Sequence, residues 1–387
     1  MFLHEAQAKD LLAAYGIPLP GGLVACTPDE AGRHAAALDG AVAVKALIHA
    51  GGRGLAGGIR FAATPEEAVL CAEDMLGRAL VTAQTRSRGE VVDEIYIERA
   101  LDFSRSLYLS IIVDQRRAVP TLIAAAEGGT AFEQRAMDAP AMVQKYPLGA
   151  DGGHNPAALA AFLDMLGVPE KAAPAVLDVV EALIRVFMEN DATLIEVNPL
   201  ALMDNHTAVA VDAKIVLDGN ALFRHPDLAA LRDTARTDET ELLAQANEIN
   251  FVRMDGAIGL VVNGAGLGLA THDMVIEAGG RPANFMDIRT MATAGQIATG
   301  IGILLDDPGV RVLLVNVHGG GMTTCDRISD ALALAMRTRD RPVPVIFRVA
   351  GQNAQAAREA VRALPNPCII PDTMSEAVRR AVAEATP

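Results

Sequence analysis

Four polar residues near the middle of the chain have the spacing of a metal site. Glu196 and Asn198 lie in the apolar run LIEVNPL, and Asp212 and Lys214 lie in VAVDAK. If the two runs form a hairpin centred on Asn205, Asn198 faces Asp212 across the strands. The same register sets Glu196 opposite Lys214, and all four side chains share one face because side chains alternate along a strand. An amide oxygen beside a carboxylate suits Mg²⁺, which takes few protein ligands and completes its shell with phosphate and water. The alternative is a cross-strand polar pair beside a surface salt bridge.

A second group combines glycines with positive charge. Lys45 is followed by HAGGRGLAGG, which runs from His49 to Gly58. Glycines let backbone N–H groups approach a phosphate, and Lys45 and Arg53 supply cationic side chains. The run joins two expected strands and lacks Gly-Lys-Ser/Thr, so it is not a Walker A loop. It predicts either a phosphate-binding loop or a hairpin loop with solvated charges.

Two further glycine turns lie in the C-terminal half. NGAGLG, from Asn263 to Gly268, follows an expected strand and opens an expected helix, and Gly319–Gly321 precede another helix. Helix N-termini attract anions, and open α/β sheets bind ligands at the carboxyl ends of their strands. These turns are therefore candidate ligand sites, with ordinary strand-to-helix turns as the alternative.

The expected elements place these residues in two halves. In the first half we expect helices over 4–15, 64–76 and 174–190, and strands over 41–49, 59–62, 92–99, 107–113, 193–203 and 207–216. In the second half, strands over 258–263, 310–317, 343–349 and 368–370 each precede a helix. This rhythm predicts a parallel sheet with helices on both faces. The polar stretch 224–250 is expected to be the linker between the two domains.

Composition excludes several classes of function. The net charge of −15 argues against a nucleic-acid binder, which needs a cationic surface. The cysteines are too far apart in the sequence for a zinc site or a disulfide scaffold, since they stand at positions Cys26, Cys71, Cys325 and Cys368. The N-terminus has no signal-peptide pattern, and no run is apolar enough to span a membrane. We expect a cytoplasmic enzyme.

Taken together, the motifs resemble a known family. The motifs occur in order along nearly the whole chain. They are LHEAQAKDLLAAYGIPLP, KALIHAGGRGLAGG, RALVTAQT, EGGTAFE, LIEVNPL, GNALFRHPDL, VNGAGLGLATHDMV and GGRPANFMD. They closely resemble the β subunits of succinate–CoA ligase and malate–CoA ligase, which are ATP-grasp acyl-CoA synthetases. The resemblance implies an α/β fold with an ATP-grasp domain over residues 1–237 and a flavodoxin-like CoA-ligase domain over residues 238–387.

The resemblance also implies a reaction shared with a second chain. In the family, ATP phosphorylates a histidine of the α subunit, the phosphohistidine gives an acyl phosphate, and CoA displaces the phosphate. ATP and Mg²⁺ would bind this chain, and CoA would bind mainly the α subunit. The partners implied are that α subunit, in a heterodimer or an α2β2 assembly, and a small carboxylic acid.

Site residues carry over from the family motif by motif. The nucleotide phosphates would be held by Lys45, Gly52, Arg53 and Gly54. Glu98 and Leu101 would lie beside the base and ribose, and Ser106 occupies a further nucleotide-contacting position. Asn198 and Asp212 would bind Mg²⁺, and Glu196 would act catalytically on the histidine loop. Asn263, Gly320, Gly321 and Met322 would border the acid site shared with the α subunit.

The chain departs from the family pattern at four places. The family usually has Lys at Leu55 and an acid at Ser106, and it differs over 287–293 and 318–326. The last two segments border the implied acid site, so they predict an acid other than succinate. They also leave open a nucleotide-binding but catalytically silent scaffolding or regulatory subunit. A self-sufficient ligase is a third reading, disfavoured because the chain lacks a phosphohistidine motif and a CoA-binding half.

Overall fold

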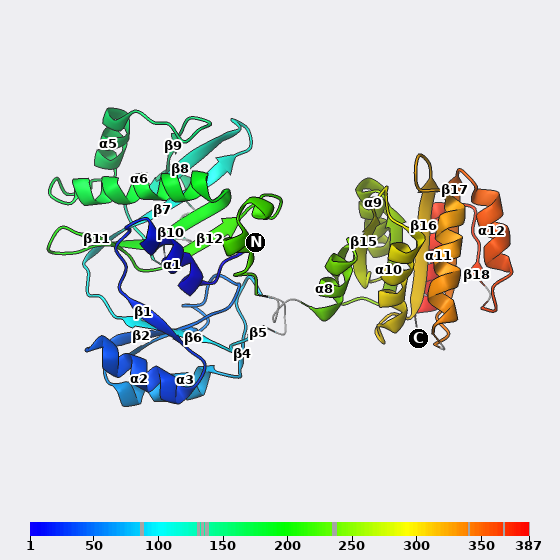
Figure 1. Ribbon diagram of the computed structural model, residues 1–387, viewed down its shortest axis with the longest axis horizontal. Coiled ribbons are helices and arrows are strands. Elements are labelled where there is room, and N and C mark those ends of the chain that lie inside the picture. Colours follow the sequence, from blue (N-terminus) through cyan, green and yellow to red (C-terminus); the bar gives the residue numbers. More distant parts are fainter. Residues whose placement is uncertain are drawn as a thin grey trace. The chain divides into compact units, whose positions relative to one another are not determined.

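The computed structural model describes residues 1–85, 89–129, 132, 135, 139–233, 238–339, 341–366 and 368–386. Its contacts divide the chain into two compact units, Met1–Arg232 and Asp233–Pro387 (Figure 1). The expected domain boundary between 237 and 238 adjoins residues 234–237, which lie outside the described residues, as do 130, 131 and 133 of the EGGTAFE motif. No described helix has the length and apolarity needed to cross a membrane.

The first sheet of the N-terminal unit carries the glycine loop. Its four antiparallel strands run in the order β1 (Gly22–Ala25), β6 (Ile95–Arg99), β2 (Val42–Ala46) and β3 (Ile59–Ala62). Helices α2 (Pro28–Leu38) and α3 (Pro65–Met75) pack on it side by side through buried alanines (Figure 1). Thr64 caps α3 by accepting from the Glu67 N–H at 3.3 Å, as its position before Pro65 predicts. A short ribbon, β4 (Ala79–Leu80) with β5 (Glu90–Val91), follows α3.

The second sheet of this unit carries the predicted metal hairpin. Its strand order is β11 (Ala208–Ala210), β10 (Ala192–Leu202), β7 (Arg105–Asp114), β8 (Val119–Ala125) and β9 (Gln144–Pro147), and β12 (Ala213–Leu217) also pairs with β10. The long helix α6 (Ala173–Glu189) buries the apolar stripe expected of it, including Val176, Val180, Leu183 and Phe187. The unit also contains the helical segments α1 (Glu5–Ala14), η1 (Pro140–Met142), α5 (Pro156–Met165), η2 (Leu222–Arg224) and α7 (Pro226–Ala229).

The register of the hairpin is the one that the sequence predicts. Glu196 pairs with Lys214 across β10 and β12, and the Asn198 N–H donates to the Asp212 carbonyl at 3.2 Å. The predicted second strand, 207–216, is broken into β11 and β12 at Val211 and Asp212. This break lets the Asp212 side chain leave the ladder and face the glycine loop, so the hairpin brings both predicted metal ligands to one surface.

The C-terminal unit is a parallel sheet with one antiparallel edge. The strand order is β13 (Asn250–Arg253), β15 (Asn284–Ile288), β14 (Ile258–Asn263), β16 (Val312–Gly319), β17 (Val345–Gly351) and β18 (Cys368–Ile369). Only β13 runs antiparallel to its neighbour. The five parallel strands follow the flavodoxin-like order, second, first, third, fourth, fifth.

Helices cover both faces of this sheet. α9 (Ala265–Glu277) and α13 (Met374–Ala385) pack together over one apolar cluster. α10 (Ala294–Asp306), α11 (Cys325–Arg337) and α12 (Ala354–Arg362) pack in a row over another cluster on the opposite face (Figure 1). This arrangement confirms the predicted parallel sheet with helices on both faces.

One expectation about the join between the two halves is wrong in detail. The stretch 224–250 is not only a linker, because it contains α7 and α8 (Glu239–Ala246) and reaches the first residue of β13. Asp238 caps α8 by accepting from the Thr240 N–H at 2.9 Å, and the helix is polar because most of it is exposed. The glycines 319–321 precede a helix as expected, with a tight turn closed by Gly320 and Thr323 before α11 begins at Cys325.

Candidate functional site

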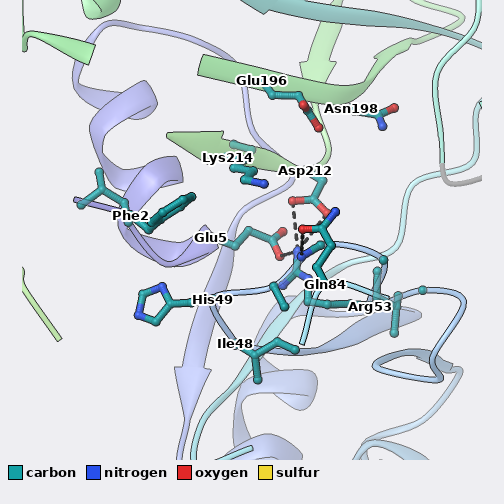
Figure 2. Close-up of a pocket in the computed structure, with 17 residues that line it drawn as sticks. Phe2, Glu5, Ile48, His49, Arg53, Gln84, Glu196, Asn198, Asp212 and Lys214 are labelled. Atoms are coloured by element: carbon teal, nitrogen blue, oxygen red, sulfur yellow. Dashed lines mark hydrogen bonds and ion pairs between the residues drawn. The ribbon is translucent and has the colours of Figure 1, made fainter. Parts of the chain in front are cut away.

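A cavity in the N-terminal unit joins the glycine loop to the metal hairpin (Figure 2). Six of the predicted site residues line it: Gly52, Arg53, Gly54, Glu196, Asn198 and Asp212. Lys214 lines it as well, opposite Glu196. Gly52 takes a φ of +73°, a left-handed conformation that a side chain would strain. The structure thus brings together two segments that lie about 140–160 residues apart and that the sequence marks separately for phosphate and metal.

Behind this cavity, acids and cations alternate in a buried network. The Glu5 carboxylate accepts from Lys9 and Lys45 at 2.8 Å each and from Arg53 at 2.7 Å. Glu98 lies beyond it and pairs with both lysines. These side chains come from α1, β2, β6 and the glycine loop, so the network ties helix α1 to the first sheet. In formal charge, the three carboxylates of Glu5, Glu98 and Asp212 balance the three cations of Lys9, Lys45 and Arg53.

The network shifts the pKa values of its members. Burial alone would raise the pKa of Glu5, but Lys45, Lys9 and Arg53 outweigh it and hold that pKa well below the ordinary range. Burial would lower the pKa of Lys45, and the carboxylates of Glu5, Asp212 and Glu98 raise it instead. Burial raises the pKa of Glu98, despite its two lysine partners. Lys45 and Arg53 therefore stay charged and fixed at the rear of the cavity.

Arg53 joins this network to the metal hairpin. Its Nη2 donates to both carboxylate oxygens of Asp212, at 3.0 and 3.2 Å, and also contacts Glu5 (Figure 2). Its Nη1 donates to the Ala46 carbonyl at 2.8 Å. The Asn198 Oδ1 accepts from the Gly129 N–H at 2.6 Å. Both predicted ligand oxygens thus already face donors, and each keeps further acceptor capacity, so the donor set fits a hard cation such as Mg²⁺.

Glu196 is held at the side of the cavity by an aromatic hydroxyl. The Tyr108 Oη donates to the Glu196 carboxylate at 3.2 Å, and the Tyr108 ring packs against Phe132 at 5.2 Å between centroids. Tyr108 lies on β7 and Glu196 on β10, two neighbouring strands. This contact fixes the direction of a half-buried carboxylate that the sequence assigns to catalysis.

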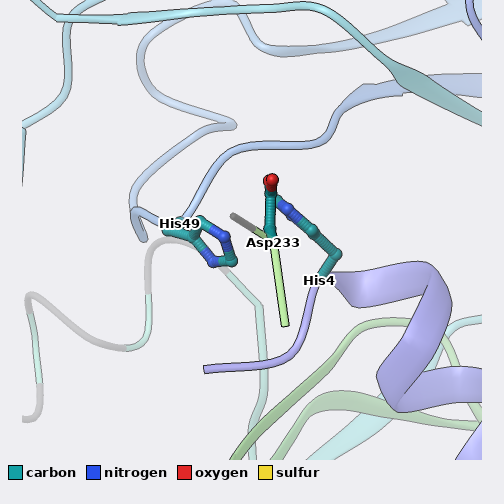
Figure 3. A group of neighbouring side chains, drawn as sticks. All are labelled: His4, His49 and Asp233. Carbon is teal, nitrogen blue, oxygen red and sulfur yellow. The ribbon is translucent and has the colours of Figure 1, made fainter. Parts of the chain in front are cut away.

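Two stacked histidines hold the start of the glycine loop against the N-terminus of α1. The rings of His4 and His49 lie 3.9 Å apart between centroids, with an interplanar angle of 29° (Figure 3). The His49 N–H donates to the Glu90 carboxylate at 3.0 Å. Glu5, next to His4, is thereby placed below the loop that carries Arg53.

In the C-terminal unit, polar residues gather at the carboxyl ends of three neighbouring strands. The Asn263 amide donates to the His318 carbonyl at 2.8 Å and accepts from the His318 N–H at 2.9 Å, joining β14 to β16. Asp287, at the end of β15, accepts from the Gly264 N–H at 2.6 Å. This edge is where open α/β sheets bind ligands, and it holds the predicted residue Asn263.

The two loops that depart from the family pattern meet at this edge. The buried Thr323 hydroxyl donates to the Thr290 carbonyl at 3.0 Å. Arg327 Nη1 reaches the Ala292 carbonyl at 3.3 Å. Met291 and Met322 nonetheless remain exposed, at 68 % and 54 %. Loop 289–293 and turn 320–323 therefore form one surface beside Asn263.

Comparison with known proteins identifies the family. Residues 2–202 match the ATP-grasp domain model, and residues 261–369 match the CoA-ligase model. The chain is 39 % identical over 387 residues to the succinate–CoA ligase [ADP-forming] subunit beta of Nautilia profundicola, covering 100 % of this chain and 99 % of that one. It is 40 % identical over 360 residues to the subunit of that name from Wolinella succinogenes, covering 93 % and 92 %.

The chain belongs to the ADP-forming succinate–CoA ligase β-subunit family. Its fold is shared more widely. ATP citrate lyase from Methanothrix soehngenii, solved with citrate and coenzyme A, superposes with a TM-score of 0.75 at 16 % identity and covers 99 % of both chains. The N-terminal unit contains the ATP-grasp domain of this ligase family, and the C-terminal unit contains its CoA-ligase domain.

The remaining predicted residues of this ligase subunit lie outside the lining of the cavity. Lys45 and Glu98 are buried in the ion network behind it. Leu101 and Ser106 are half-buried, and Ser106 pairs with Ala201 on β10. Leu55 is 74 % exposed at the tip of the glycine loop. The nucleotide contacts predicted for Lys45, Glu98, Leu101 and Ser106 stay predictions.

Sequence reasoning missed two residues that organise the ligase site. Glu5 and Lys9 lie on one face of α1, separated by one helical turn, and both are buried. The sequence feature that could have indicated this buried pair is an acid and a lysine four residues apart, on the side of the helix that also carries buried Ala8 and Leu12. Gln84, which accepts from the Gly51 N–H at 2.9 Å, was also missed.

Substitution of Thr323 tests whether the two loops of the C-terminal unit support each other. Thr323→Val removes the hydrogen bond to Thr290 and should lower the free energy of unfolding by about 1 kcal/mol. Thr386→Val is the matched control, because the exposed Thr386 hydroxyl bonds within its own helix end, to Val382 at 2.8 Å. Urea unfolding of both variants measures the difference. Equal losses in the two variants would contradict a role for Thr323 in joining the loops.

Proposed function

We propose that this chain is the nucleotide-using β subunit of an ADP-forming acid–CoA ligase. The observation that carries the proposal is one cavity in which the glycine loop, the Asn198–Asp212 hairpin and Glu196 face one another. A phosphate chain needs backbone donors, cations and a metal site at one place, and the glycine loop, Arg53 and the Asn198–Asp212 pair would supply them in this cavity. The curated relatives carry the name of an ADP-forming ligase subunit, which supports the same reaction class.

Each group in the cavity has a separate task in this reaction. The backbone of Gly52 and Gly54 would receive the nucleotide phosphates, with Arg53 beside them and Lys45 held in the ion network behind the cavity. Asn198 and Asp212 would hold Mg²⁺, which would neutralise phosphate charge there. Glu196 would orient the attacking histidine of the partner subunit. Glu98, Leu101 and Ser106 would border the base and ribose.

The second chain is part of the proposal. The partner would be the α subunit, which provides the phosphorylated histidine and most of the CoA site, in a heterodimer or an α2β2 assembly. We propose residues 1–237 as the ATP-grasp domain and 238–387 as the CoA-ligase domain. The measured mass of the complex purified with its α subunit distinguishes the two assemblies.

The acid would bind at the carboxyl edge of the C-terminal sheet. Asn263, Gly320, Gly321 and Met322 would border it, next to the loop 289–293. The relatives are named for succinate. Because Arg289, Met291 and Met322 are exposed beside this edge, we propose that they select a different small acid.

Turnover with the α subunit tests the proposed reaction. The complex is mixed with ATP, Mg²⁺, CoA and a panel of small carboxylic acids that includes succinate and malate, and ADP release is measured. We expect acid-dependent ADP release, fastest with an acid other than succinate. ATP binding without phosphorylation of the α subunit would overturn the proposal and favour a catalytically silent subunit. Activity of the chain without any partner would indicate a self-sufficient ligase.

Substitution of Asn263 separates the acid step from the ATP step. Asn263→Ala loses both hydrogen bonds to His318 and loosens the edge where the acid would bind. We expect the KM for the acid to rise about tenfold or more, since a misplaced binding group weakens its ligand. Phosphorylation of the α subunit by ATP should keep its wild-type rate. A loss confined to that phosphorylation would contradict the assignment of Asn263 to the acid.

A further inference from the structure

Lys214 is a cation of the cavity to which neither the family motifs nor the metal hairpin assigns a task. It lies on β12, across from Glu196 on β10, and its side chain shares a face with Asn198 and Asp212. Figure 2 shows its amino group pointing toward the middle of the cavity, between the strand that carries Glu196 and the carboxylates of Glu5 and Asp212. Lys214 therefore reaches the space where the predicted phosphate and metal sites meet.

The other cations of this region already have carboxylate partners. Lys9 and Lys45 each contact Glu5 and Glu98, and Arg53 contacts Glu5 and Asp212. Three acids and three cations thus compensate one another, and the network brings no excess positive charge to an incoming phosphate chain. A cation outside this network would add to the charge that Mg²⁺ supplies and stabilise a phosphoryl group bound there.

Lys214 is available for that purpose. Through its side chain it forms no hydrogen bond or ion pair within the part of the chain that the structure describes, and its ammonium lies 5.8 Å from the centre of the Phe2 ring. It is half-buried, and Phe2 and Ala213 line the cavity beside it. A half-buried ammonium loses part of its hydration, so its attraction for an anion exceeds that of a fully solvated lysine.

We propose that Lys214 is a catalytic residue that binds the terminal phosphoryl group of ATP while it passes to the partner subunit. This inference rests on the proposed function. In the step, the bond between the terminal phosphorus and the bridging oxygen breaks, and its electron pair leaves with ADP. A new bond forms between phosphorus and the lone pair of a neutral imidazole nitrogen of the partner. Lys214 stays protonated and stabilises the charge on the phosphoryl oxygens.

Single-turnover phosphorylation of the α subunit by ATP tests the assignment. In the intact complex, Lys214→Met should slow this transfer about 100-fold, the usual loss when one charge-stabilising group is removed. Lys214→Arg, which keeps the charge, should recover part of the rate. Affinity for ADP with Mg²⁺ should change less than about threefold, because ADP lacks the group that Lys214 binds. Lys171→Met, at an exposed lysine outside the cavity lining, is the matched control and should keep the wild-type rate.

The outcomes separate this inference from the proposed function. If the wild-type complex transfers no phosphate, the proposed function fails. If it does and Lys214→Met transfers at the same rate, the assignment of Lys214 is wrong. Equal losses of ATP and ADP affinity with an unchanged transfer rate would also overturn it. Lys214→Gln replaces the Met variant should that variant fail to fold, as judged by thermal unfolding.

Discussion

Asp212→Ala should abolish phosphorylation of the α subunit, with the single-turnover rate reduced by roughly 1,000-fold or more. The substitution removes the one carboxylate of the predicted metal pair and leaves only the Asn198 amide. It also removes one of the two carboxylate partners of Arg53, whose Nη2 donates to both Asp212 oxygens and contacts Glu5. The cavity would then lose a metal ligand and gain an uncompensated cation, so nucleotide could still bind while transfer stops.

The control for this loss comes from the same hairpin. Asp204 lies in the exposed turn between β10 and β11, so Asp204→Ala changes the net charge equally without touching the cavity. It should phosphorylate the α subunit at the wild-type rate. Titration with Mg²⁺ at fixed ATP adds a second readout, and Asp212→Ala should need far more metal for any residual transfer. Wild-type transfer by Asp212→Ala would remove Asp212 from the metal site.

Glu5→Gln should be among the most destabilising substitutions in the N-terminal unit. Glu5 is buried and contacts Lys9, Lys45 and Arg53 within 2.7–2.8 Å. The amide keeps the shape of the side chain but leaves three buried cations facing a neutral group. Breaking a buried ion pair on one side costs about 3–5 kcal/mol, and we expect a loss of free energy of unfolding in that range. Asp10→Asn, an exposed acid on the same helix, should lose less than about 0.5 kcal/mol.

The effect of Glu5→Gln depends on pH in a defined direction. The cations hold the folded-state pKa of Glu5 well below its usual range. A depressed carboxyl pKa contributes stability above the unfolded pKa, about 4.3, and that stability is lost as pH falls through the folded-state value. The gap in melting temperature between wild type and variant should therefore be full above about pH 5.5 and shrink on acidification. A gap that stays constant down to pH values near 3 would contradict a charged Glu5.

Local patterns predicted the parts of the site that lie on single elements. Alternation along two strands and one polar turn determined the register of the hairpin, because a slip of one residue would bury Glu196 and expose Val197. The carboxyl-end position of Asn263 followed from the strand and glycine turn around it. In both cases the determining interactions lie within a few residues or one hairpin.

Interactions between residues far apart in the chain could not be predicted from the sequence in the same way. Glu5 meets Lys45 at a separation of 40 residues, and Lys9 meets Glu98 at a separation of 89. The acid and lysine one turn apart on the apolar side of α1 are a local signal, but they do not identify the distant partners that complete the network. The helix α8 was missed because its surface is mostly polar, and the break between β11 and β12 coincides with the contact of Asp212 with the distant Arg53. These features arise only when separate elements pack.

The most direct test of the account follows the terminal phosphate of ATP. ATP labelled on that phosphate is mixed with the complex of this chain and its α subunit in the presence of Mg²⁺, without acid or CoA. The account predicts that label appears on a histidine of the α subunit in one turnover, that ADP is released in equal amount, and that removal of Mg²⁺ stops both. Release of labelled inorganic phosphate without any labelled α subunit would contradict it.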